Sequence, residues 1–406
     1  MHRHSLRSIT AHMPRLQFLT MRYTVKATPK DFIVEELLAS PLEETGAYAV
    51  YRVTKRLLTT LEVQERIAQQ LNVSPRDVVF PTLKDKGALA TQFCTVRGSG
   101  PQRLSGAGYE AHAAGRMSRH LNPRDISGNR FTLTIGVPSA GDAERLAARL
   151  REIAEHGLPN YFDEQRFGSY SPGGLFIGKA ILQRDAEAAL RAYFTQPAPG
   201  DPPDLRAFKR IAKDRWPDWK YLFEQAPRSN HRSILSFFKD HPSDFRKAVN
   251  LITPRLLPLL LSAYQSFLWN RIASRYLQSI AGLVPPEGAK LEIAGEPLAL
   301  YRTLPKEPLD SLRRLLAPLP NHQARLRDPT LARIVQETLA QEGFCLGDMK
   351  ARILQNAYLA KGERPLLLFP REMSAQALSD TSIQAKFVLP PGAYATLVVK
   401  VAASAA

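Results

Sequence analysis

Strand-like segments near the two ends of the chain, separated by a long centre of different character, constrain the fold more than any other feature. Residues 31–36 and 48–53 have the apolar patterning of strands, and Phe131–Ile135 alternates strictly between apolar and other side chains. The centre, residues 160–345, is rich in helical patterns, loops and prolines. This distribution predicts an α+β fold in which one sheet domain is interrupted by a helix-rich insertion.

The C-terminal region is expected to return to the sheet. Residues 383–389 and 394–401 are rich in β-branched residues and are separated by a Pro-Pro-Gly turn at 390–392, which predicts a β-hairpin. We therefore divide the chain into four parts. They are a basic leader (1–22), the N-terminal part of the sheet domain (23–159), the insertion (160–345) and the C-terminal part of the sheet domain (346–406).

Charge and cysteine content narrow the class of function. The formal net charge is +17, which indicates a polyanionic partner such as a nucleic acid, because a field of this sign concentrates phosphate chains. The only two cysteines, Cys94 and Cys345, exclude a disulfide scaffold and fit a reducing compartment. No window is long and apolar enough for a membrane span, and Leu256–Trp269 is expected to be a buried helix.

The first residues are basic and carry no acid before Asp31. Such a start is compatible with an organelle transit peptide. The other interpretation is a basic leader with Met21 as an alternative start, and we favour it because the leader has no convincing amphipathic period. A cytoplasmic protein is therefore expected.

Two motifs suggest chemistry that their context does not support. Gly173–Lys179 (GGLFIGK) fits the spacing of a phosphate-binding loop, but Ala180 stands where a Ser or Thr is needed and no strand precedes it. The histidines are scattered without the spacing of metal ligands. We expect neither a metal nor a nucleotide cofactor.

The segment Phe80–Gln92 holds the best candidate for a catalytic group. A short strand leads into Lys84-Asp85-Lys86, and a second strand follows at Phe93. Two flanking ammonium groups would favour the ionised form of the Asp85 carboxylate, as a nucleophile requires. The alternative interpretation is an ordinary solvated turn, which the tripeptide alone would favour.

The neighbouring sequence argues against that alternative. LKDKGALATQ, which begins at Leu83, resembles the signature of the TruD-type tRNA pseudouridine synthases, in which the aspartate is the nucleophile. Further segments resemble the same family in the same order. They are KATPKDFIVEE (26–36), GNRF (128–131), LPNYFDEQRFG (158–168), SAYQSFLWN (262–270) and KFVLPPGAYAT (386–396).

The resemblance implies a fold and a reaction. The fold is that of pseudouridine synthases, with a mixed, largely antiparallel sheet, and the insertion corresponds to the family's TRUD domain. The reaction is the isomerisation of a uridine in tRNA, typically position 13 of the D-arm, to pseudouridine, with the base flipped out and no cofactor. The partner is tRNA, no obligate protein partner is evident, and a monomer is expected. A non-catalytic RNA-binding protein or RNA chaperone on the same fold remains the alternative.

The resemblance also assigns aromatic residues to the target base. It implies that Phe131 and Phe387 lie at the base and that Phe32 contacts the substrate. Stacking on an aromatic face stabilises a flipped base by about 1–3 kcal/mol. The alternative for each phenylalanine is ordinary core packing, and Phe131 in particular begins a strand.

Two polar residues complete the expected site. Asn129 has an amide that suits the edge of a uracil, although it could equally be a turn residue. Lys26 is expected near the Asp85 carboxylate, with a phosphate contact or a solvated charge as alternatives. The segment Asn160–Gly168 either holds the two domains in register or lines the RNA cleft. The cations Lys209, Arg210, Lys213 and Arg215 are expected to contact phosphates or to form a solvated helix face.

Overall fold

The computed structural model describes residues 21–25, 27–171, 173–280 and 290–404. Most of the leader and Lys26 therefore lie outside the described residues. In the described parts, nine strands form one sheet in the order β14-β15-β7-β1-β4-β2-β6-β5, with β3 paired to β4. The strands are β1 (Phe32–Leu38), β2 (Tyr48–Lys55), β3 (Val78–Val79), β4 (Leu89–Arg97), β5 (Arg103–Gly106), β6 (Tyr109–Met117), β7 (Ile126–Gly136), β14 (Arg371–Ser379) and β15 (Ser382–Leu389).

The sheet is mixed and largely antiparallel, as the family resemblance implies. Only β1 and β4 run parallel among the strand pairs that the structure describes, and the other pairs of this sheet are antiparallel. In β7 the alternation of the sequence becomes an alternation of burial, with Leu133 and Ile135 fully buried. The strand β1 thus pairs its Val34–Leu37 part with the GNRF motif of β7, and Val34 lies opposite Phe131.

The expected C-terminal hairpin is wrong in its second arm. β15 pairs with β14 and β7, whereas the chain beyond Gly392 forms the helix α12 (Ala395–Ser404). This helix packs on α2 (Ala140–His156), which covers β14 and β15. Leu397, Val398 and Val399 are all fully buried, so the helix is enclosed on several sides. Burial all round overrides the strand preference of its valines.

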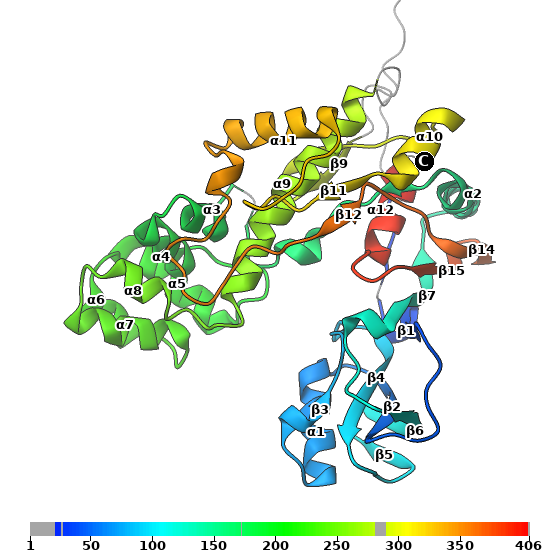
Figure 1. Cartoon of the computed structure of the whole chain (residues 1–406), viewed down its shortest axis with the longest axis horizontal. Helices are drawn as coiled ribbons and strands as arrows, with labels where there is room; N and C mark the ends of the chain where they lie inside the picture. The colour runs from blue at the N-terminus through cyan, green and yellow to red at the C-terminus, as the bar shows by residue number, and fades with distance from the viewer. Residues whose placement is uncertain (1–20, 26, 172, 281–289, 405–406) are drawn as a thin grey trace, which may run out of the picture.

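Helices dominate the centre of the chain (Figure 1). α4 to α8 gather into a lobe at a distance from the sheet, and the long helix α9 runs from this lobe alongside α11 and β10. The helices are α3 (Ile177–Leu182), α4 (Ala186–Thr195), α5 (Pro203–Arg215), α6 (Trp219–Gln225), α7 (Asn230–Asp240), α8 (Phe245–Val249), α9 (Leu257–Ser279), α10 (Lys306–Arg314) and α11 (Pro329–Gln341). A further helix, α1 (Thr60–Leu71), covers β3 and begins at the capping box of Thr59 and Glu62. Short 3-10 helices are η1 (Pro29–Asp31), η2 (Pro75–Asp77), η3 (Pro123–Asp125), η4 (Glu164–Phe167) and η5 (Leu346–Asp348).

The chain enters and leaves the central region through paired strands. β8 (Leu158–Pro159) pairs antiparallel with β13 (Leu367–Leu368), and we call this pair the neck. The central region between the two strands of the neck contains two more small sheets. One pairs β9 (Lys290–Ile293) with β10 (Glu296–Ala299), and the other pairs β11 (Leu316–Pro318) with β12 (Glu363–Pro365). Within the described residues, no helix is both long and apolar enough to cross a bilayer.

Candidate active site

The loop between β3 and β4 carries Asp85 and is fixed from α1 and β2. The Lys84 amide donates to the Thr60 hydroxyl at 3.0 Å. The Lys55 ammonium donates to the backbone oxygen of Leu58 at 2.9 Å and to that of Asp85 at 2.7 Å. These bonds hold the backbone at the aspartate while its side chain is exposed.

Lys55 is a functional residue that the sequence analysis missed. It is only 1% exposed, and burial lowers its pKa to about 8, although the nearby negative charge of Asp85 opposes that shift. A lysine in a strand carries no sequence signal that distinguishes a buried ammonium from a solvated one. Its register opposite Ala90 in β4 directs it toward the loop.

The two lysines that flank Asp85 form ion pairs with glutamates. The Lys84 ammonium pairs with the buried Glu36 carboxylate at 2.5 Å, and Lys86 lies 3.7 Å from the exposed Glu62. Glu36 also accepts from the Phe93 amide at 2.9 Å. The structure therefore directs both ammonium groups to other carboxylates, and Lys84 ties the catalytic loop to β1.

The Asp85 carboxylate meets a residue from the centre of the chain. Gln165 Nε2, in η4, donates to Asp85 Oδ2 at 2.8 Å. Gln165 belongs to the NYFDEQRFG segment that the sequence analysis singled out without a role for this side chain. The contact joins two motifs that are far apart in the sequence.

A cavity of about 240 Å³ opens beside this carboxylate. Its walls come from five segments of the chain, namely β1, the loop between β3 and β4, β7, η4 and the stretch from Pro391 to the start of α12. The lining residues include Phe32, Lys84, Asp85, Asn129, Phe131, Gln165, Tyr394 and Thr396. Four of the six site residues expected from the sequence thus surround one cavity.

The aromatic residues form a short row of which only part reaches the cavity. Phe32 and Phe131 line it, with ring centroids 5.9 Å apart in an edge-to-face arrangement. Phe387 is 1% exposed and packs behind Phe131, with centroids 5.7 Å apart. The structure adds Tyr394, from KFVLPPGAYAT, to the lining. Burial raises the pKa of its phenol, so this hydroxyl keeps its proton.

Asn129 presents an amide to the same cavity. Its Oδ1 is buried and makes no hydrogen bond within the residues that the structure describes. The neighbouring Gly128 lies tight against β15, since a Cβ there would be 2.7 Å from the Leu389 oxygen. A buried polar atom without a partner is costly, so this acceptor suits a donor brought by a ligand.

The segment 160–168, which we call the junction segment, holds the sheet and the central region together. Asp163 is 1% exposed, accepts from Lys400 Nζ at 2.5 Å and also accepts from the Thr396 hydroxyl. Arg364 donates to the Asn160 backbone oxygen at 2.7 Å and lies over the Phe162 ring. Of the two roles expected for this segment, these contacts support the register between the two parts.

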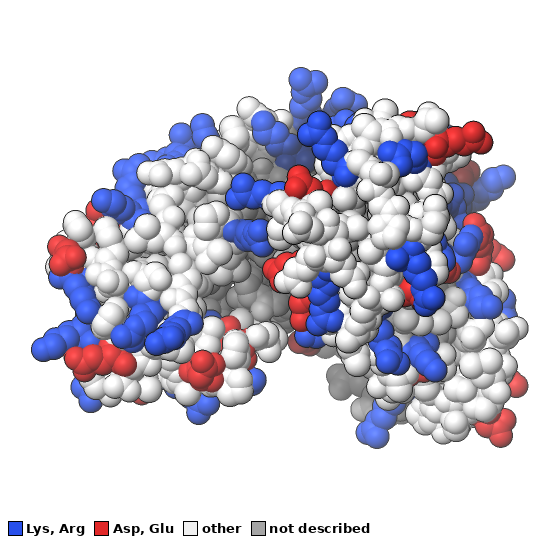
Figure 2. Space-filling model, turned by 90° about the horizontal axis from the view of Figure 1, so that it is seen from below, with Lys and Arg blue, Asp and Glu red and all other residues white. Residues whose placement is uncertain are grey.

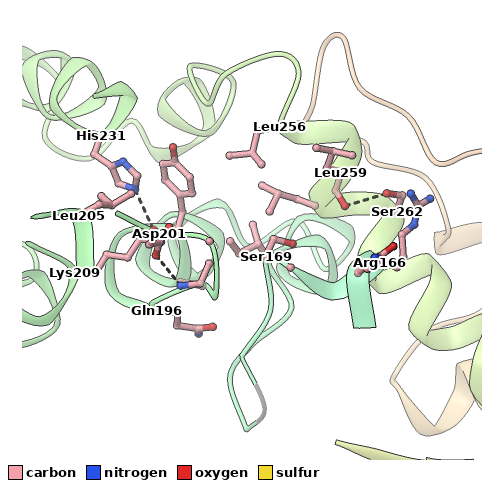
Figure 3. Close-up of a pocket in the computed structure, with 18 residues that line it drawn as sticks. Arg166, Ser169, Gln196, Asp201, Leu205, Lys209, His231, Leu256, Leu259 and Ser262 are labelled. Atoms are coloured by element: carbon pink, nitrogen blue, oxygen red, sulfur yellow. Dashed lines mark hydrogen bonds and ion pairs between the residues drawn. The ribbon is translucent and has the colours of Figure 1, made fainter. Parts of the chain in front are cut away.

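A second cavity, of about 400 Å³, also has Gln165 among its lining residues and is shown in Figure 3. Its charged groups are already satisfied, since Lys209 pairs with Asp201 at 2.8 Å. Burial lowers the pKa of His231 to about 4, so this histidine is neutral. Lys209 is thus a buried structural cation, contrary to the phosphate contact or solvated charge expected of it. The reactive groups converge on the smaller cavity.

The rejected phosphate-binding motif has a structural role. Lys179 lies in α3 and pairs with Glu342 at 2.7 Å, which also accepts from the Tyr264 hydroxyl. Among the described residues, no group of three or more His, Cys, Asp or Glu side chains could hold a metal ion. Figure 2 shows a hollow between the helical lobe and the sheet, with Lys and Arg side chains on both sides.

Comparisons with known proteins agree with this arrangement. Residues 18–401 match the family model of tRNA pseudouridine synthase D (TruD). The "Probable tRNA pseudouridine synthase D" of Methanopyrus kandleri is 30% identical over 362 residues, covering 87% of this chain and 85% of that protein. The tRNA pseudouridine synthase D of Aquifex aeolicus is 26% identical over 390 residues, covering 94% and 98%.

A solved structure shows the same fold. The crystal structure of a TruD protein from Methanosarcina mazei superposes with a TM-score of 0.69 at 23% sequence identity, covering 94% of each chain. The family match spans nearly the whole chain, including both the sheet and the helical centre. The chain therefore belongs to the TruD family and is a tRNA pseudouridine synthase, an isomerase.

Proposed function

We propose that the enzyme converts uridine 13 in the D-arm of tRNA to pseudouridine, with Asp85 as the nucleophile. The observation that carries this proposal is the exposed Asp85 carboxylate at the wall of a cavity that is also lined by two phenylalanines and Asn129. Chemistry at C1′ and C5 of a uridine requires the nucleotide to be outside its helix. The target uridine must therefore leave its stack, at a cost of a few kcal/mol.

The residues of the cavity have distinct roles in this proposal. Phe131 and Phe32 offer rings against the flipped uracil, and Phe387 supports Phe131 from behind. Asn129 Oδ1 accepts from the imide N–H of the base. Lys26 is proposed as a cation near Asp85 on the resemblance alone.

The chemistry needs no added group. Asp85 attacks either ribose C1′ or uracil C6, and the C1′–N1 bond breaks. The uracil turns, C1′ bonds to C5, and the C5 hydrogen leaves as a proton. Atoms are conserved between substrate and product, so we propose a reaction without a cofactor, by a monomer without an obligate protein partner.

The segment between the strands of the neck, residues 160–366, is proposed as the TRUD insertion, which extends beyond the bound of 345 expected from the sequence. Its basic side chains on one side of the hollow, and those of the sheet on the other, would bind phosphates and position the tRNA. A cytoplasmic location is supported by the use of only two cysteines, which are not paired with each other.

The test is release of tritium from 5-tritiated uridine in a tRNA transcript, followed by mapping of the modified position. We expect one equivalent of tritium for each tRNA and a product at position 13. Binding of tRNA without tritium release would favour the non-catalytic alternative. Tritium release from a uridine at another position would support the proposed reaction but show that position 13 is not the target.

A further inference from the structure

We propose that Gln165 is a positioning residue for the reaction, because it fixes the orientation of the Asp85 carboxylate from the central region of the chain. The inference rests on the proposed role of Asp85 as nucleophile. Its direct support is the 2.8 Å hydrogen bond from Gln165 Nε2 to Asp85 Oδ2. Both side chains line the catalytic cavity, so the bond lies where the substrate reacts.

The chemistry of the two groups fixes the direction of this bond. An ionised carboxylate only accepts hydrogen bonds, so the Gln165 amide must present its NH2 group to it. The bond engages Oδ2 and limits rotation of the carboxylate.

The backbone that carries Gln165 is held firmly on both sides. Asp163 binds Lys400 and Thr396 in α12, and Arg166 Nε donates to the Ser266 hydroxyl in α9 at 3.1 Å. Glu164 accepts from the Ala294 amide at 3.0 Å. The junction segment is therefore anchored both to the sheet and to the central region.

Because of these anchors, the hydrogen bond between Gln165 and Asp85 depends on the position of the central region relative to the sheet. Asp85 is held on the sheet through Lys55, whereas Gln165 is held largely by elements of the central region. The carboxylate reaches its bound orientation only when both parts are in register. Gln165 thereby connects the placement of the TRUD insertion to the nucleophile itself.

The charged and titratable groups around Asp85 influence the pH dependence that a variant at position 165 would show. Lys55 lies beneath it on β2, Tyr394 lies beside it at the start of α12, and Lys84 and Lys86 flank it in the loop. Glu62 on α1 pairs with Lys86. A new carboxylate at position 165 would lie closer to Asp85 than Glu62 does, so it would dominate the change in pH dependence.

Two substitutions separate positioning from a merely structural role. Gln165→Met keeps the length of the side chain and removes the donor. We expect the single-turnover rate at saturating tRNA to fall about tenfold or more, because a hydrogen bond to a charged group is lost. The dissociation constant for tRNA and the melting temperature should stay close to those of the wild type.

Gln165→Glu gives a signature that packing cannot produce. At low pH the two carboxyl groups share a proton, and a protonated Glu can donate to Asp85 as Gln does. At higher pH both groups ionise, the donor is lost, and the charges repel. The rate of Gln165→Glu relative to the wild type should therefore be highest near pH 5 and fall toward pH 8.

Two controls make the outcome decisive. Glu164→Gln changes the neighbouring side chain of the same 3-10 helix, can keep its bond to Ala294, and should leave the rate unchanged. Asp85→Asn is measured in parallel, and a normal rate there would remove the nucleophile and the proposed function with it. With Asp85→Asn inactive, a wild-type rate in Gln165→Met would overturn the inference alone. A rate ratio for Gln165→Glu that does not vary with pH would overturn it as well.

Discussion

The loop between β3 and β4 and the junction segment each carry an aspartate within a family motif. The two carboxylates nevertheless differ in burial and in the charge of their partners. Asp85 is exposed and accepts from the neutral amide of Gln165, and the Lys55 ammonium binds its backbone oxygen. Asp163 is 1% exposed and accepts from both Lys400 and Thr396. The first arrangement keeps the carboxylate at the wall of a cavity, whereas the second neutralises the charge and fixes the fold. Burial and the charge of the partner, not the strength of the motif, distinguish the two roles.

Removal of the first carboxylate should have the largest effect on activity. We expect Asp85→Asn to abolish pseudouridine formation while the affinity for tRNA changes only a few-fold, because phosphate contacts dominate binding. Single-turnover tritium release and equilibrium tRNA binding measure the two quantities. Lys86→Gln, in the same loop, is the control and should keep its rate at saturating tRNA. Activity in Asp85→Asn close to the wild type would show that the comparison of the two aspartates is mistaken.

Removal of the second carboxylate should instead affect stability. Asp163→Ala leaves the Lys400 ammonium and the Thr396 hydroxyl without their acceptor, and breaking a buried pair in this way costs about 3–5 kcal/mol. Chemical denaturation should show a loss toward the lower end, because the Lys400 side chain is 24% exposed. The exposed pair of Arg333 and Glu337 is the control, since Glu337→Gln should cost less than about 1 kcal/mol. A stability loss for Asp163→Ala no larger than that of the control would contradict the structural role.

The phenylalanine row offers a similar contrast within the sheet. Phe131→Leu should lower the single-turnover rate by about tenfold, because its ring faces the cavity and stacking contributes about 1–3 kcal/mol per base. Phe387→Leu should act mainly on stability, since this ring is buried behind Phe131. Thermal melts and rates of both variants measure the difference. A larger rate loss in Phe387→Leu than in Phe131→Leu would reverse the assignment.

The smallest expected effect concerns the pH dependence of stability. The pKa of Lys55 is lowered to about 8 in the folded protein, whereas an unfolded lysine titrates near 10.4. Between these values the unfolded chain binds the extra proton, so the free energy of unfolding should rise with pH in this range. Lys55→Met should lack this rise. Chemical denaturation of both proteins from pH 7.5 to pH 10 measures it, and parallel curves would show that Lys55 has an ordinary pKa.

The sequence predicts the sheet well where periodicity and burial agree. The strict alternation around Phe131 became β7, and the capping box at Thr59 became the start of α1. The stretch after Gly392 misled the prediction because its valines favour strands, while the space that it fills, beside α2, is enclosed on several sides. Local propensity carries no information about such an enclosure.

The candidate site was predictable in its residues more than in its contacts. The resemblance gathered Phe32, Asn129 and Phe131 correctly around the position of Asp85. It did not reveal that Lys84 binds Glu36, that Lys55 is buried, or that Gln165 reaches the Asp85 carboxylate. Each of these contacts joins residues far apart in the chain. Tertiary packing determines where each of these side chains points, and the residues next to it in the sequence do not reveal that packing.

The neck has a consequence for how this architecture tolerates change in length. Because β8 and β13 hold the two crossing points side by side, everything between Pro159 and Leu367 is, to the sheet, one closed loop. The entropy of closing a loop grows only with the logarithm of its length, so each doubling costs about 0.6 kcal/mol. Additions to the outer lobe of α4 to α8 would therefore cost the sheet little. Additions between the neck and Gln165 would displace the amide that binds the Asp85 carboxylate.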